Sequence, residues 1–135
     1  MIRKHAFSFK NAIAGIVWAF KTQSNFKIHL VISLVAITGG FILHISYSEF
    51  LVILTLIGIG LAIEALNTAI EEAIDAIHKD WTEEIKIAKD VSAAAMLTFA
   101  ITAFIIACII FIPRILGLLN LIINFIQLNP EPPGF

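Results

Sequence analysis

Residues 50–77 decide the fold, and they read FLVILTLIGIGLAIEALNTAIEEAIDAI. The first part, residues 50–63, carries no charge, and the first charged side chain is Glu64. Polar residues then recur at helical spacing to the end of the segment. An apolar run of this length, continued by a helical pattern, predicts a membrane-spanning helix whose last turns project out of the hydrocarbon.

The polar residues of this segment share one face. At 100° per residue, Glu64, Asn67, Glu71 and Asp75 lie within an arc of roughly 80°. Ionisable groups at membrane depth are costly without partners, so the stripe predicts cations, a metal ion or a polar headgroup beside it. The alternative is a helix end exposed to water, which suits Asp75 better than Glu64.

The whole chain has the composition of an integral membrane protein. Of its 135 residues, 59% are apolar and 14% are charged, which leaves no room for a separate soluble catalytic domain. We predict an all-α membrane protein with an amphipathic surface helix and three spans. The expected ranges are 6–22 for the surface helix and 28–45, 50–77 and 86–112 for the spans.

The two ends of the chain carry different signals. Residues 1–27 contain basic side chains and no acids, which predicts a cytoplasmic N-terminus. Pro113 is expected to end the third span. Residues 113–128 then form an apolar extension that we interpret as an interfacial helix, with a fourth span as the alternative, and residues 129–135 are a proline-rich tail expected to be disordered.

A second polar cluster precedes the third span. Lys86, Lys89 and Asp90 are spaced i, i+3, i+4 and share a helix face. Lysines beside a helix N-terminus attract anions, and the free backbone N–H groups there add to the attraction, which suits a phosphate group. Taken alone, Lys86 is better interpreted as a solvated lysine.

Three ordered motifs resemble one known family. They are residues 25–29 (NFKIH), residues 64–71 (EALNTAIE) followed by Asp75, and residues 88–90 (AKD). Over about residues 4–112 the chain resembles the prokaryotic integral-membrane diacylglycerol kinases, of the Gram-positive undecaprenol kinase type. The resemblance implies transfer of the ATP γ-phosphoryl group to the hydroxyl of a membrane lipid, diacylglycerol or undecaprenol. It also implies a homotrimer with composite sites at the cytoplasmic face of a bacterial cell membrane, and no nucleic-acid partner.

The resemblance also implies roles for individual residues. Glu64 corresponds to the general base, Asn67 to an orienting amide, and Glu71 to the carboxylate that holds Mg²⁺. Gln23 stands where the family has a second metal-binding glutamate, and an amide contributes no negative charge to the ion. The nucleotide-binding positions are implied to be Lys4, Asn11, Glu71, Asp75, Asp80, Trp81, Thr82, Lys89 and Asp90.

Two other functions fit parts of the sequence. In a small proton or ion translocator, Glu64 would be the carrier carboxylate and His29 or His44 its relay partner. No polar series continues from Glu64 toward the outer leaflet, which argues against this function. A non-catalytic membrane assembly subunit gains weight from the neutral Gln23.

Overall fold

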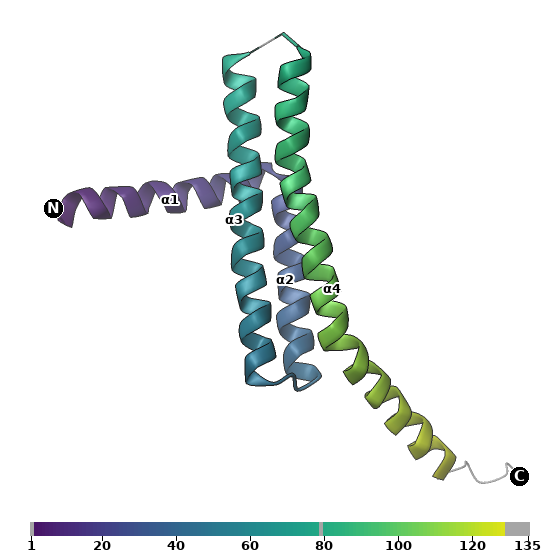
Figure 1. Ribbon diagram of the computed structural model, residues 1–135. Helices are drawn as coiled ribbons and strands as arrows, with labels where there is room; N and C mark the ends of the chain where they lie inside the picture. Colours follow the sequence, from purple (N-terminus) through teal and green to yellow (C-terminus); the bar gives the residue numbers. More distant parts are fainter. Residues whose placement is uncertain (1, 79, 129–135) are drawn as a thin grey trace, which may run out of the picture.

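The computed structural model describes residues 2–78 and 80–128, with the backbone alone for residues 2–4 and 6. Four helices follow one another: α1 (Ile2–Thr22), α2 (Ser24–Ile42), α3 (Tyr47–Ile77) and α4 (Glu83–Leu128). Figure 1 shows α1 projecting sideways from an upright bundle of the other three. The tail predicted to be disordered, residues 129–135, lies outside the described part of the chain.

The predicted fold class is confirmed. The described residues are organised in helices without a strand, and α2, α3 and α4 are long and apolar enough to cross a membrane. Each helix begins a few residues before the predicted start, because polar residues continue the first turn. In α3, for example, Ser46 and Glu49 form a reciprocal capping box that starts the helix at Tyr47.

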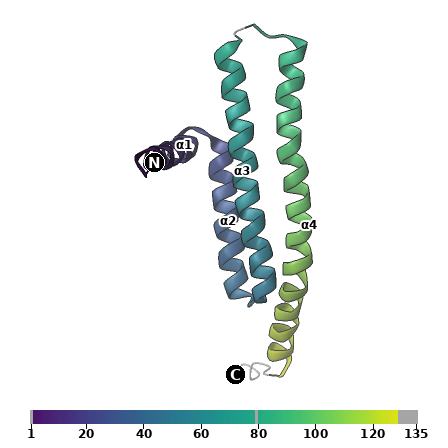
Figure 2. The same cartoon turned by 60° about the vertical axis from the view of Figure 1, so that its left-hand side comes forward.

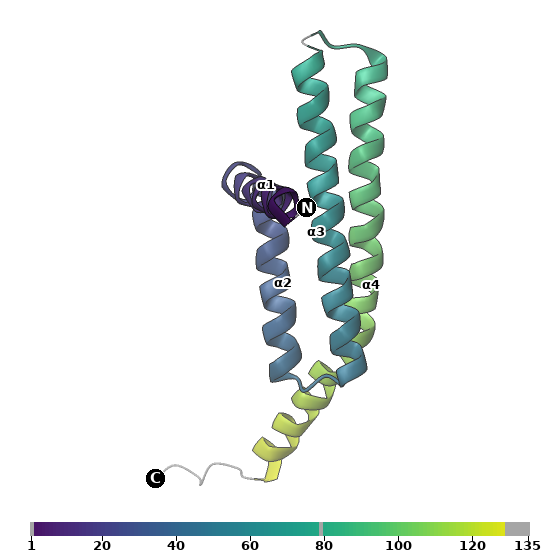
Figure 3. The same cartoon turned by 90° about the vertical axis from the view of Figure 1, so that its left-hand side faces the viewer.

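Helix α3 is the centre of the bundle. It packs against α2 on one side and α4 on the other, and Figures 2 and 3 both show it between them. A Cβ at Gly60 would lie 2.5 Å from the Phe99 ring, so only glycine lets α4 pack this closely at that height. A Cβ at Gly58, by contrast, would meet nothing within 4 Å.

The prediction that Pro113 ends the third span is wrong, because α4 continues through it to Leu128. Proline removes one backbone donor and crowds the preceding turn. The Arg114 guanidinium donates from Nη1 to the Ile110 carbonyl at 2.8 Å, so it supplies a donor in the turn that the proline disturbs. In hydrocarbon, breaking the helix would leave several backbone groups unsatisfied, which favours continuation. The yellow-green end of α4 leans away from the bundle (Figure 1).

The bundle is uneven in length. Helix α2 begins near Glu72, in the last part of α3, so the last turns of α3 pair with α4 alone (Figure 2). This step, where α1 turns into α2, is the level at which the polar stripe of α3 begins to leave the packed part of the bundle.

Candidate active site

The polar stripe on α3 runs from buried to exposed. Glu64 is 2% exposed and Asn67 8% exposed, Glu71 is half-buried and Asp75 is exposed. The stripe therefore joins the interior of the bundle to its outer end, over about 16 Å from Glu64 to Asp75. The alternative of a solvated helix end holds for Asp75 and is wrong for Glu64.

Glu64 has one partner within ion-pair distance among the described residues. His29 on α2 places Nε2 3.8 Å from Oε2 of Glu64, and no side chain or backbone group in the described ranges donates a hydrogen bond to this carboxylate. His44, the other relay candidate, lies in the turn between α2 and α3 at the far end of α2, with a φ of 50°. The structure therefore brings only one of the two histidines to Glu64.

Asn67 and Glu71 interact one turn further along. Asn67 donates from Nδ2 to Oε1 of Glu71 at 3.2 Å, so its amide orients Glu71 rather than Glu64. Its Oδ1 atom is buried and accepts no hydrogen bond. An unpartnered buried oxygen beside a half-buried carboxylate is the type of ligand that Mg²⁺ prefers, and Mg²⁺ usually takes one or two protein carboxylates together with substrate phosphates. The residues here fit that pattern, although the described residues contain no group of three or more His, Cys, Asp or Glu side chains that could hold a metal ion.

Gln23 contacts α3 at Glu72, the residue after Glu71 and outside the stripe. It occupies the N-cap position of α2 without capping it, and its Nε2 donates to Oε1 of Glu72 at 3.2 Å. Gln23 is therefore a neighbour of the predicted metal-binding segment, with Glu72 as its partner. Glu72 is exposed.

The side chains of Lys89 and Asp90 have different partners. Lys89 crosses from α4 to α3, where Nζ donates to Oδ1 of Asp75. Asp90 accepts from Lys86 Nζ at 2.7 Å along the same helix. Lys89 thus joins the stripe, whereas Asp90 and Lys86 form an exposed pair beside it.

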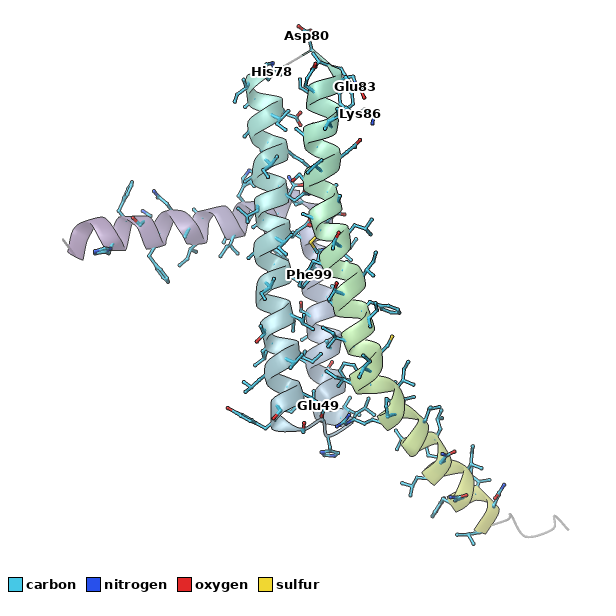
Figure 4. All side chains as sticks on the ribbon, in the orientation of Figure 1. Glu49, His78, Asp80, Glu83, Lys86 and Phe99 are labelled. Carbon is cyan, nitrogen blue, oxygen red and sulfur yellow. The ribbon has the colours of Figure 1, made fainter. Side chains whose placement is uncertain are left out.

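The other predicted nucleotide residues are not brought to the stripe. Asp80, Trp81 and Thr82 lie in the turn at the far end of the α3–α4 hairpin, where Figure 4 labels Asp80. Glu71 is six residues, or about 9 Å, from the end of α3 at Ile77, and the turn lies beyond that end. Asn11 is exposed on α1, and the side chain of Lys4 lies outside the described residues.

Sequence reasoning missed two buried polar side chains and a cavity. Thr68 on α3 is 6% exposed and Ser92 on α4 is 8% exposed. The signal for Ser92 was its i+3 spacing from Lys89, which places both on the inner face of α4. The cavity, of about 400 Å³, lies between α2, α3 and α4, and His29 and Ser33 are its only polar lining residues among those described.

The chain matches known proteins over most of its length. The profile of the prokaryotic diacylglycerol kinase family matches residues 10–111. An undecaprenol kinase of Bacillus subtilis is 36% identical over 108 residues, which are 80% of this chain and 88% of that protein. A diacylglycerol kinase of Synechocystis is 36% identical over 113 residues, which are 83% of this chain and 65% of that protein.

A third relative, a diacylglycerol kinase of Pseudomonas aeruginosa, is 30% identical over 84 residues, or 62% of this chain and 68% of that protein. These matches decide against the ion translocator and the non-catalytic subunit. The match to the family profile starts before α2 and ends just before Pro113, so it includes the whole polar stripe and leaves out the apolar extension. The chain belongs to the prokaryotic diacylglycerol kinase family and is a lipid kinase of the membrane.

Proposed function

We propose that this protein transfers the γ-phosphoryl group of ATP to the hydroxyl of a membrane lipid at the cytoplasmic face of a bacterial cell membrane. One observation carries the proposal: the stripe on α3 begins at a buried carboxylate beside an apolar cavity and ends at exposed carboxylates. A lipid hydroxyl arrives from hydrocarbon and a nucleotide from water, so the two substrates meet along this stripe.

Glu64 is the general base. As the lipid oxygen bonds to the γ-phosphorus, its proton passes to the Glu64 carboxylate, and the bond from phosphorus to the oxygen bridging the β and γ phosphates breaks to release ADP. A positioned base contributes about 10²–10⁴-fold to such a step. Glu64 has free lone pairs for that proton because no described group donates a hydrogen bond to it.

Glu71 is the carboxylate that would hold Mg²⁺. Gln23 lies close by, because it donates a hydrogen bond to Glu72, the next residue of α3. When bound, Mg²⁺ neutralises charge on the transferring phosphates. Asn67 fixes Glu71 in one orientation through its 3.2 Å hydrogen bond. In this arrangement Asn67 supports the carboxylate of the ion and leaves the base free.

The nucleotide binds beside these groups. Lys89 offers a positive charge to the phosphates, and Asp75 holds it at the stripe in the free protein. Asp90, Asp80, Trp81, Thr82, Lys4 and Asn11 complete the proposed contacts. Because Asn11 lies on a helix that points away from its own bundle (Figure 1), we infer a homotrimer in which α1 of one subunit reaches the site of another.

The test is direct. The purified protein in mixed micelles with radiolabelled ATP and Mg²⁺ is assayed against undecaprenol and diacylglycerol separately. We expect labelled lipid phosphate with at least one acceptor, because the apolar cavity suits the hydrocarbon chains of either lipid. Labelling of neither lipid by a folded protein would contradict the proposal.

A further inference from the structure

The surroundings of Glu64 leave its carboxylate without a conventional hydrogen-bond donor. On α3, Asn67 donates to Glu71, and on α2 the Ser33 hydroxyl donates to the His29 carbonyl at 2.7 Å. Among the described residues, His29 alone is within ion-pair distance, with Nε2 3.8 Å from Oε2.

His29 also borders the apolar cavity. Its side chain is 26% exposed, while the side chain of Glu64 is 3% exposed. A lipid hydroxyl that moves from this cavity toward Glu64 therefore comes close to the imidazole. The Ser33 hydrogen bond to the carbonyl of His29 lies one turn further into the bundle on the same helix.

We propose that His29 is a positioning residue, which holds the Glu64 carboxylate toward the mouth of the cavity through an Nε2–H donated to Oε2. The inference rests on the proposed function, in which Glu64 is the base. The 3.8 Å separation is longer than a hydrogen bond, and catalytic contacts of this length in a substrate-free site tighten when the substrate excludes water. An unpaired carboxylate at membrane depth is costly, and the imidazole partly offsets that cost.

Three substitutions at His29 separate positioning from packing. His29→Leu fills similar space without a donor. His29→Gln places an amide N–H near the position of Nε2, whereas His29→Asn places its donor nearer that of Nδ1. The full chain in mixed micelles is assayed with undecaprenol and again with diacylglycerol, and kcat and the KM values for ATP and lipid are measured with the thermal unfolding midpoint.

We expect His29→Leu and His29→Asn to lower kcat at least tenfold, with the KM for ATP within about twofold of wild type. We expect His29→Gln to retain kcat within about threefold. The matched control is His44→Asn, in the distant turn, where asparagine tolerates the positive φ of 50°. This control should leave kcat unchanged.

Equal losses in the Gln and Leu variants, or kcat within twofold of wild type in His29→Leu, would overturn the positioning role. A fall in the unfolding midpoint that accounts for the lost activity would overturn it as well. Glu64→Gln distinguishes the two proposals. If that variant is inactive and His29→Leu is fully active, only the role of His29 is wrong, whereas an active Glu64→Gln removes the proposed base and the role of His29 with it.

Discussion

Two glutamates on α3 have opposite environments. Glu49, in the first turn, accepts from the Ser46 backbone N–H at 2.7 Å, from the Ser46 hydroxyl at 2.6 Å and from Arg114. Glu64, four turns later, is almost fully buried and accepts no hydrogen bond from the described residues, among which only His29 lies within ion-pair distance. The carboxylate of Glu49, at the start of α3, accepts three hydrogen bonds and has a structural role. The carboxylate of Glu64 accepts none from the described residues and is therefore available for chemistry.

The largest effect on kcat is expected from substitution of Glu64. Glu64→Gln keeps the shape of the side chain and removes the proton acceptor, so kcat should fall by about 10²–10⁴-fold while nucleotide binding persists. The matched control is Glu49→Gln, which should keep kcat within about twofold and lower the thermal unfolding midpoint instead. Turnover of Glu64→Gln within a few-fold of wild type would show that the buried carboxylate is not the base.

The second prediction concerns Glu71, which is intermediate between the two glutamates because it has one amide partner. Glu71→Ala removes the main anionic ligand proposed for Mg²⁺, so the half-saturating Mg²⁺ concentration should rise by more than tenfold at fixed ATP. Glu72→Ala, on the neighbouring exposed residue, is the control and should shift it far less. An Mg²⁺ titration of Glu71→Ala that matches wild type would contradict the role.

The third prediction sharpens the comparison at Gln23. Gln23→Glu places a carboxylate opposite Glu72 and next to Glu71, so a divalent ion gains an anionic ligand. An additional 1.4 kcal/mol or so would lower the half-saturating Mg²⁺ concentration about tenfold. If Gln23 serves only its hydrogen bond to Glu72, like-charge repulsion should instead lower the unfolding midpoint and leave the Mg²⁺ titration unchanged.

The smallest effect is expected at the saturated end of α3. Arg114→Gln removes the guanidinium from Glu49 and from the Ile110 carbonyl, so the unfolding midpoint should fall by a few degrees with kcat unchanged. Combining it with Glu49→Gln should cost less than the sum of the single variants, because the two residues are partners. Strict additivity would mean that the pair contributes nothing to stability.

Most of the fold could be predicted from local pattern. The apolar run before Glu64 and the 100° periodicity after it predict a helix and a shared face, and both depend only on neighbouring residues. The burial of Glu64 beside apolar neighbours followed from the same pattern. These features need no knowledge of which helices pack together.

Other features depend on tertiary contacts that no local pattern contains. The bond from Gln23 to Glu72 arises because α2 starts at that height beside α3, and Lys89 reaches Asp75 only because α3 and α4 form a hairpin. The prediction of a helix end at Pro113 rests on the backbone cost of proline alone. Two effects favour continuation of the helix: the Arg114 side chain bonds the preceding turn, and hydrocarbon offers no water to the freed backbone groups. Both depend on the folded protein and its solvent.

Of the three bundle helices, α2 is the shortest, so it is the helix most sensitive to bilayer thickness. Its 19 residues span about 28 Å, close to the roughly 30 Å of a typical hydrocarbon layer, and it is bounded by the turn into α1 at one end and the turn into α3 at the other. Helices α3 and α4 are longer than the hydrocarbon layer is thick, whereas α2 only just spans it. In a thicker bilayer the mismatch falls on α2, drawing the turn at Gln23, and with it the contact to Glu72, toward the hydrocarbon.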